Sequence, residues 1–496
     1  MLPLRHFIPA RNYIPFVTSN VLHCKRYSNL LISTMLLATF HAVAQPSTES
    51  DQEEVVIDER NQQATIERVI KIDKVWAGHP VGFSLLTEED RQYIAYYNDE
   101  RHMIVGQRYL HQDTFELHKI PPHPRESWEE TSTILGWDSH NYLTLGLDNE
   151  GYIHLSGNMH VNGLTYFRST EPGDISTLVQ IKEMVGTEEN RCTYPVFLNT
   201  VENELIFRYR DGGSGNGNDI YNKYDSDTRQ WTRLVDTPLT DGQDSVNAYA
   251  SRPSLREDGW YHMYWVWRDT PDCSTNHDLS YMKSPDMLHW YNAYGQPVDL
   301  PVTVDNKSVV VDPIPVQGGI INLAAKLCLD EDNQPIFAYH KYDATGNLQF
   351  YTARLMGEAW QIKQVTNWDY RWYFSGNGSI NKEVFIGPFN RREDGFYELG
   401  YDHIKYGAGT LLLNQDLKVS GKVLKPQPFA ATVAVEGKFP GLKVRTAEDS
   451  GKATDEPLQY VLKWETLPRN RDKPRPKPWP EPSQLYLYEL RRSPNN

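Results

Sequence analysis

The sequence WDSHNYLTLGLDNEGYIHLSGNMHVNGLTYFR, residues 137–168, contains two short strand patterns joined by a polar turn. Apolar and aromatic residues dominate 142–147 and 152–155, and turn-forming residues fill 148–151 between them. This arrangement predicts a β-hairpin. A histidine stands at each end of the pattern, with His140 before the first strand and His160 after the second.

The rest of the chain repeats this style of short strands separated by turns, with no convincing long amphipathic helix, and this favours an all-β fold. The segment LTYFRS at 164–169 resembles LSYMKS at 279–284, and looser copies recur about every 60 residues. The repeat predicts a seven-bladed β-propeller of four-stranded antiparallel blades over residues 65–496. Strands near 64–72 and 484–489 are expected to close the ring.

The N-terminus has the pattern of an export signal. Lys25 and Arg26 precede the apolar run 30–40, and the small residues 42–44 supply a cleavage pattern. We expect residues 1–44 to be a signal peptide with an unusually long prefix, residues 45–64 to be a polar segment, and the protein to be secreted or periplasmic.

The net charge and the hydropathy of the sequence limit the classes of partner that we expect. The net charge of −15 argues against nucleic-acid binding. No run of about 20 apolar residues exists that would predict a membrane span. We expect a monomer without an organic cofactor.

Four cysteines are present, and one of them, Cys24, belongs to the predicted signal. Two of the other three, with two histidines, have the composition of a closed structural zinc site, in which Cys273 and His277 pair with Cys328 and His340. The alternative for an exported protein is a Cys273–Cys328 disulfide.

Further candidate residues lie at other strand ends. Arg208 and Arg210 should share one face of a strand that runs into the glycine-rich segment 211–218. Guanidinium groups pair well with carboxylate or sulfate. Tyr194 and Tyr249 each stand where a new blade is predicted to begin. Any one of these residues alone is equally consistent with a structural role.

The motifs DSHN, SGNMH, TYP and FRYRDGGSGNGN, in this order, resemble the ulvan lyases, which are seven-bladed propeller polysaccharide lyases with BNR repeats. The resemblance implies a catalytic set of His140, His160, Arg210, Tyr194 and Tyr249. We also expect four further residues to contact substrate, namely Arg208, Asn141, Asn158 and Ser214.

The implied chemistry is β-elimination at a 4-linked uronate of ulvan, a sulfated rhamnose and uronic-acid polysaccharide. Arg210 would neutralise the carboxylate, while His140 and Tyr249 would serve as the base and acid pair. His160 and Tyr194 would position the sugar. Two alternatives stay open: a propeller glycoside hydrolase acting on rhamnosyl-uronate linkages, and a non-catalytic carbohydrate-binding propeller.

Overall fold

Strands make up nearly all of the regular structure. The computed structural model describes residues 55–124, 132–453 and 458–492, so the predicted signal peptide and residues 45–54 lie outside the described residues. In the described parts the α-helix is α1 (Phe429–Thr432), and there are four 3-10 turns: η1 (Arg60–Gln62), η2 (Ile175–Thr177), η3 (Cys273–Thr275) and η4 (Lys307–Val309). The expected all-β class is confirmed.

The predicted hairpin is present. Strand β7 (Leu143–Leu147) pairs antiparallel with β8 (Ile153–Gly157). In the same sheet β8 pairs with β10 (Tyr166–Ser169), and β10 pairs with β11 (Leu178–Gln180).

The described strands form six sheets in all. One four-stranded sheet combines a strand from the N-terminal part of the described chain with three from its C-terminal part. Its order is β2 (Thr65–Val75), β32 (Ser483–Arg491), β31 (Leu458–Thr466), β29 (Lys443–Glu448). The next has the order β30 (Lys452–Ala453), β3 (Ser84–Glu89), β4 (Arg91–Tyr97), β5 (Met103–Tyr109), β6 (Glu116–Lys119).

The largest sheet has ten strands. Its main path runs β20 (Val310–Asp312), β19 (Asn276–Ser284), β18 (Tyr261–Arg268), β16 (Asn247–Ala250), β14 (Asn216–Asp225), β13 (Leu205–Gly213), β12 (Cys192–Asn199), β9 (His160–Asn162). Two strands lie off this path, with β15 (Gln230–Arg233) on β14 and β17 (Ser254–Leu255) on β18.

Two sheets complete the set. One is β21 (Ala325–Leu329), β22 (Pro335–Tyr342), β23 (Leu348–Met356), β24 (Ala359–Gln364). The other is β1 (Val55–Asp58), β28 (Val419–Leu424), β27 (Gly407–Leu413), β26 (Tyr397–His403), β25 (Val384–Arg391). Because β1 pairs parallel with β28, residues 55–58 of the predicted N-terminal segment 45–64 belong to this sheet.

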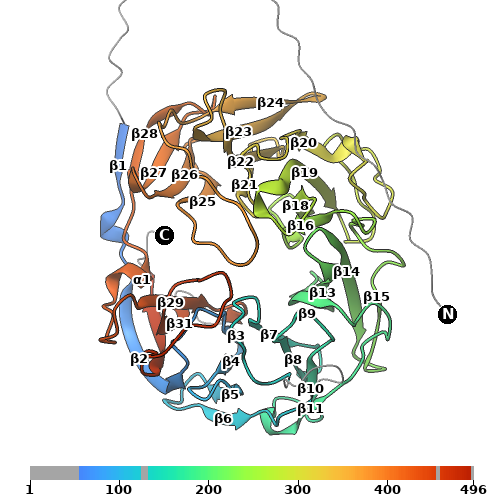
Figure 1. The fold of residues 1–496 in the computed structure, drawn as a ribbon, viewed down its shortest axis with the longest axis vertical. Coiled ribbons are helices and arrows are strands. Elements are labelled where there is room, and N and C mark those ends of the chain that lie inside the picture. Colours follow the sequence, from blue (N-terminus) through green and yellow to red (C-terminus); the bar gives the residue numbers. More distant parts are fainter. Residues whose placement is uncertain (1–54, 125–131, 454–457, 493–496) are drawn as a thin grey trace, which may run out of the picture. The chain divides into compact units, whose positions relative to one another are not determined.

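The sheets follow one another around a common centre, and β7, β21, β25 and β29 are the strands at the inner ends of their sheets (Figure 1). Strands β2 and β32 pair antiparallel from Thr65 with Arg491 to Val75 with Ser483. The predicted pairing of the N-terminal and C-terminal strands is therefore confirmed. It joins the second strand and the last strand of the described chain in one sheet.

Large aromatic side chains pack on the faces of these sheets, and Trp265, Trp267, Phe207 and Tyr209 are essentially inaccessible to solvent. The third histidine of the hairpin region, His154, belongs to this interior. Its Nδ1 lies 2.8 Å from the Tyr166 hydroxyl. Burying so much aromatic surface makes the strands rigid supports for the loops at their ends.

Candidate active site

His140 and His160 meet beside one carboxylate. Their rings are stacked at a slight tilt, 4.1 Å apart between centroids. Asp138 Oδ1 accepts from His140 Nδ1 at 2.6 Å, and Asp138 Oδ2 accepts from His160 Nδ1. Burial alone would raise the pKa of Asp138, but the two histidine hydrogen bonds lower it, so this carboxylate is ionised at neutral pH. With Nδ1 held by Asp138, each ring keeps Nε2 as the nitrogen available for proton transfer.

A second carboxylate reaches the same loop from the far end of the sequence. Asp472, between β31 and β32, accepts from the backbone and hydroxyl of Ser139 at 3.1 and 2.8 Å. It also accepts from the backbone and hydroxyl of Ser379, both at 2.8 Å. Its Oδ2 lies 3.6 Å from His140 Nδ1. Asp472 therefore joins three segments of the chain behind the histidine pair.

This arrangement predicts how Asp472 contributes to stability. Burial tends to raise the pKa of Asp472, but hydrogen bonding from Ser139 and the nearby His140 lower it below its usual value. A depressed pKa means that the stabilisation is present at neutral pH and disappears as pH falls below the usual aspartate range. We expect Asp472→Asn to lower the free energy of unfolding by about 1–3 kcal/mol at pH 7, measured by urea denaturation.

The same measurement at about pH 3 should show a smaller difference between variant and parent, because below the usual aspartate pKa the unfolded chain binds a proton that the folded carboxylate does not yet bind. An equal loss at both pH values would contradict this account of Asp472.

Arg210 lies on β13, on the other side of Tyr194. The guanidinium carbon is 4.9 Å from the centroid of the Tyr194 ring, and the His140 ring is 5.8 Å from the same ring. Arg210 is only 2% exposed, and none of its three side-chain nitrogens has a hydrogen-bond partner within the described residues. A Cβ at Gly217 would lie 2.8 Å from the Arg210 side chain, so glycine there gives the arginine its space.

A cavity of about 380 Å³ opens at this arginine. Tyr194, Arg210 and Tyr249 are three of its walls, and the full lining is Tyr142, Tyr194, Arg208, Arg210, Ala248, Tyr249, Ala250, Ser251, Arg252, Asn322 and Leu323. The histidine pair is not part of the lining but adjoins it through Tyr194. A hollow of this size with unpaired positive charge at its wall suits an anionic sugar.

Tyr249 is set up as an unusually acidic phenol. Its hydroxyl receives a hydrogen bond from Arg268 at 3.0 Å and lies 2.7 Å from the Ser214 hydroxyl. Burial would raise the pKa of Tyr249, but the positive charges of Arg268 and Arg210 outweigh it and lower the pKa. Tyr194, 6.3 Å away between ring centroids, differs because burial raises its pKa.

The structure thus brings together the five residues of the predicted catalytic set, through direct contacts or shared walls. Ser214 also joins them, through its bond to Tyr249. Arg208 lines the cavity as expected, but it is ion-paired with buried Asp219 at 2.6 Å. This pairing gives Arg208 a structural role that the sequence did not reveal.

The two predicted substrate-binding asparagines differ from each other. Asn158 is buried, and its side-chain amide donates to the carbonyls of Ser132 and Ile134, which holds these two segments together. Asn141 anchors its loop through its carbonyl, which accepts from Tyr97 at 2.7 Å. Its Oδ1 has no partner within the described residues.

The four predicted zinc ligands are not brought to one point. His277 contacts Asp269 and Asp278, at 2.9 and 3.3 Å, and His340 Nδ1 contacts the carbonyl of Gly319 at 2.7 Å. Asp138, His140 and His160 are the described residues whose ligand atoms gather closely enough for one ion. In this structure the four predicted ligands do not form a closed tetrahedral site; they are Cys273, His277, Cys328 and His340.

Both cysteines of this set are buried free thiols, so the alternative disulfide is not formed either. Zinc binding by the chain stays a prediction, and elemental analysis of dialysed protein tests it.

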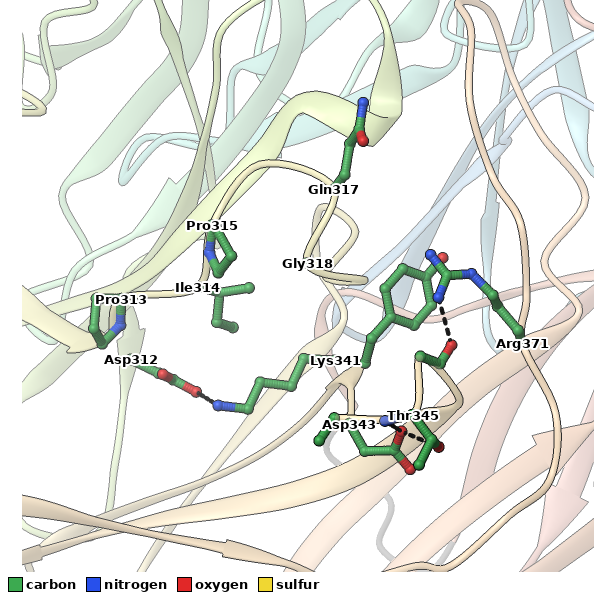
Figure 2. Close-up of a pocket in the computed structure, with 13 residues that line it drawn as sticks. Asp312, Pro313, Ile314, Pro315, Gln317, Gly318, Lys341, Asp343, Thr345 and Arg371 are labelled. Carbon is green, nitrogen blue, oxygen red and sulfur yellow. Dashed lines mark hydrogen bonds and ion pairs between the residues drawn. The ribbon is translucent and has the colours of Figure 1, made fainter. Parts of the chain in front are cut away.

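A second hollow, of about 540 Å³, lies between the segment after β20 and the β22–β23 turn. Figure 2 shows that its charged groups are already engaged: Lys341 pairs with Asp312 at 2.6 Å, and Arg371 donates to the Gly346 carbonyl at 2.8 Å. With its charges neutralised by protein groups, this hollow is a weaker candidate for an anionic ligand.

Sequence reasoning missed three charged members of the site. Asp138 lies inside the DSHN motif, and its spacing of two residues from His140 was an available signal. Arg268 and Asp472 had none, because they reach the site from strands and loops far along the chain.

Solved structures with a similar fold are polysaccharide lyases. The polysaccharide lyase Uly1 is 13% identical, with a TM-score of 0.55, over 86% of this chain and 99% of that one. The PL25 ulvan lyase, bound to a GlcA(1-4)Rha3S chain, has the same identity and TM-score over 86% of this chain and 96% of its own. No curated protein sequence matches significantly.

Two general findings complete the comparison. Among the described residues, none of the helices is both long and apolar enough to cross a membrane. The BNR repeat-containing family model matches residues 91–368, more than half of the chain, and the protein therefore belongs to the BNR repeat-containing family.

Proposed function

We propose that this protein is an exported polysaccharide lyase that cleaves ulvan, or a closely similar uronate polymer, by β-elimination. The observation that carries the proposal is the buried guanidinium of Arg210, which has no ion-pair partner within the described residues and lies between the rings of Tyr194 and Tyr249. Burying an unpaired charge is costly, and such a group is retained where a ligand completes it. A substrate carboxylate would do so.

We also propose that the scaffold is the seven-bladed propeller expected from the repeats. The ten-stranded sheet is continuous across β14 and β16 only through one parallel pair, Gly217 with Asn247. Divided there, it becomes two sets of strands, one of β9 with β12–β15 and the other of β16–β20. Each set has the same antiparallel order as the other sheets, which brings the number of blades to seven.

In the proposed reaction, Arg210 binds the uronate carboxylate and stabilises negative charge as the C5 proton leaves. His140 takes this proton at Nε2, while Asp138 fixes the ring through Nδ1. The C4–O4 bond breaks, a C4–C5 double bond forms, and the Tyr249 hydroxyl gives its proton to O4. The lowered pKa of Tyr249 suits it to donate. His160 and Tyr194 shape the cleft.

Hydrolysis is less well supported. It requires two carboxyl groups, one of them a general acid whose pKa is raised so that it stays protonated. The carboxylates beside His140 are Asp138 and Asp472, and the pKa of each is lowered by its hydrogen-bond donors. Neither is suited to deliver a proton near neutral pH.

Incubating the protein with ulvan tests the proposal. We expect the ultraviolet absorbance of the C4–C5 double bond to rise together with the number of reducing ends. New reducing ends without this absorbance would indicate a hydrolase. Binding of ulvan without either signal would indicate a carbohydrate-binding protein.

The proposed role of Tyr249 as the proton donor predicts how the activity depends on pH. Tyr249 must be protonated to act as the acid, so activity should fall as pH rises through its pKa, which lies below the usual value near 10. Replacing Arg268 by methionine removes the nearest positive charge on the ring, 4.1 Å from its centroid. The alkaline limb of kcat/KM should therefore move to higher pH in this variant.

The matched control is Arg229→Met, an arginine that is 4.3 Å from the Tyr152 ring and distant in the fold from Tyr249. It should leave the limb in place. An unchanged limb in Arg268→Met would remove Tyr249 from the acid role.

A further inference from the structure

A second group of positive side chains lies near the centre of the described chain, outside the cavity at Arg210. We call Lys326, Lys382, Arg445 and Arg469 the inner cation cluster. Lys326 is on β21, Lys382 lies two residues before the start of β25, and Arg445 is on β29. These three strands end their sheets at the centre (Figure 1). Arg469 lies between β31 and β32.

The cluster is unusual because no carboxylate balances it. Within the described residues none of its four members forms an ion pair; the side-chain hydrogen bond that is present runs from Arg445 to the Thr466 hydroxyl at 3.3 Å. The nearest acidic neighbour of Lys382 in sequence, Glu383, instead accepts from Tyr370. By contrast, the cation of the second hollow, Lys341, is paired with Asp312.

The cations lie close enough to repel one another. Lys326 Nζ and Lys382 Nζ lie 5.8 and 5.5 Å from the centroid of the same ring, Phe385, which is 45% exposed. Burial, together with the charges of Arg469 and Lys326, lowers the pKa of Lys382 to about 8. Lys382 is nevertheless reached by solvent. Its ammonium group is therefore accessible to a ligand.

The cluster also adjoins the candidate active site. Lys382 and Arg469 are each three residues from one of the hydrogen-bonded pair Ser379 and Asp472. Three residues span at most about 11 Å of extended chain, and Asp472 itself lies 3.6 Å from His140. An extended ligand bound at the histidines could therefore reach the cluster.

We propose that the inner cation cluster is a second anion-binding subsite, which takes a sulfate ester or carboxylate of the polysaccharide at a sugar removed from the bond that breaks. This inference rests on the proposed function, since it assumes a polyanionic chain in the cleft. Four unpaired cations in a protein with a net charge of −15 provide the local positive field that such a chain needs. The exposed Phe385 ring offers an apolar face for the sugar between the two lysines.

The first experiment measures binding without catalysis. Dextran sulfate carries sulfate esters but no uronate, so its retention of the protein in affinity electrophoresis is independent of elimination. We expect the parent to be retarded by dextran sulfate and not by neutral dextran. The double variant Lys326→Ala/Lys382→Ala should bind at least about tenfold more weakly, as expected for losing charge-assisted contacts.

The control is Lys119→Ala, a lysine on the outer strand β6 paired with Glu100 at 3.4 Å, which should bind like the parent. Melting temperatures check that each variant is folded. Equal retardation of the parent and the double variant, or no retardation of the parent, would overturn the subsite.

The second experiment uses ulvan and desulfated ulvan as substrates. The double variant should raise KM for ulvan about tenfold with little change in kcat, because the cluster binds and does not react. If the defect disappears on desulfated ulvan, the group bound is sulfate; if it persists, the group is carboxylate. An unchanged KM on both polymers would contradict the subsite. If the parent cleaves neither polymer, the proposed function fails, while the dextran sulfate result still decides the subsite.

Discussion

Replacing Arg210 by alanine should lower kcat on ulvan by at least about a hundredfold, the scale found when a preorganised stabiliser of transition-state charge is removed. The guanidinium is buried at the cavity wall with its nitrogens unpaired within the described residues. Its charge is therefore available to the substrate carboxylate, whose negative charge grows as the C5 proton leaves. The rate of increase of the double-bond absorbance at saturating ulvan measures the effect.

The same residue makes a second, opposite prediction for stability. A buried cation without a partner costs folding free energy, so Arg210→Met, which keeps most of the side-chain volume, should melt at the same temperature as the parent or higher. Loss of activity in a protein of equal or greater stability would separate catalysis from folding.

The matched control for Arg210 is its neighbour on the same face, Arg208, which is paired with Asp219. Arg208→Met should lower the melting temperature, because it leaves a buried carboxylate alone. Near-normal turnover in Arg210→Ala would remove Arg210 from the mechanism and would leave the cavity as a binding feature.

Replacing His140 by alanine should also lower kcat by about a hundredfold or more, as expected for losing a general base. The ring is held between Asp138 and the neighbouring His160, which is the orientation that proton transfer through Nε2 requires. The loss should appear in kcat more than in KM, since the histidine acts on the proton and not on substrate charge.

Two variants test whether orientation matters as proposed. Asp138→Asn should be nearly as damaging as His140→Ala, because the amide no longer holds both Nδ1–H groups and the correct tautomer is lost. His289→Ala, at an exposed histidine bonded to Asp286 in a surface turn, is the control and should be neutral. Turnover of His140→Ala within a few-fold of the parent would assign the base elsewhere, with His160 as the next candidate.

The sequence by itself determined the strands and the end closure. The apolar segments on either side of the polar residues 148–151 predicted the β7–β8 hairpin. Two short strand patterns separated by a tight turn are compatible with few structures other than an antiparallel pair. The aromatic strand at the C-terminus predicted the pairing with β2. Motif resemblance, rather than physics, selected His140, His160, Arg210, Tyr194 and Tyr249.

Only the tertiary structure decided which polar groups have partners. Arg208 and Arg210 look alike in the sequence, yet one meets Asp219 and the other meets no partner within the described residues. The roles of Asp472 and Arg268 depend on contacts between segments hundreds or tens of residues apart, which no local pattern encodes. The predicted zinc ligands show the same limit, because the sequence names the four side chains but does not show how far apart the fold places them. The composition shows which metal-binding side chains are available, but only the fold determines which of them lie close together.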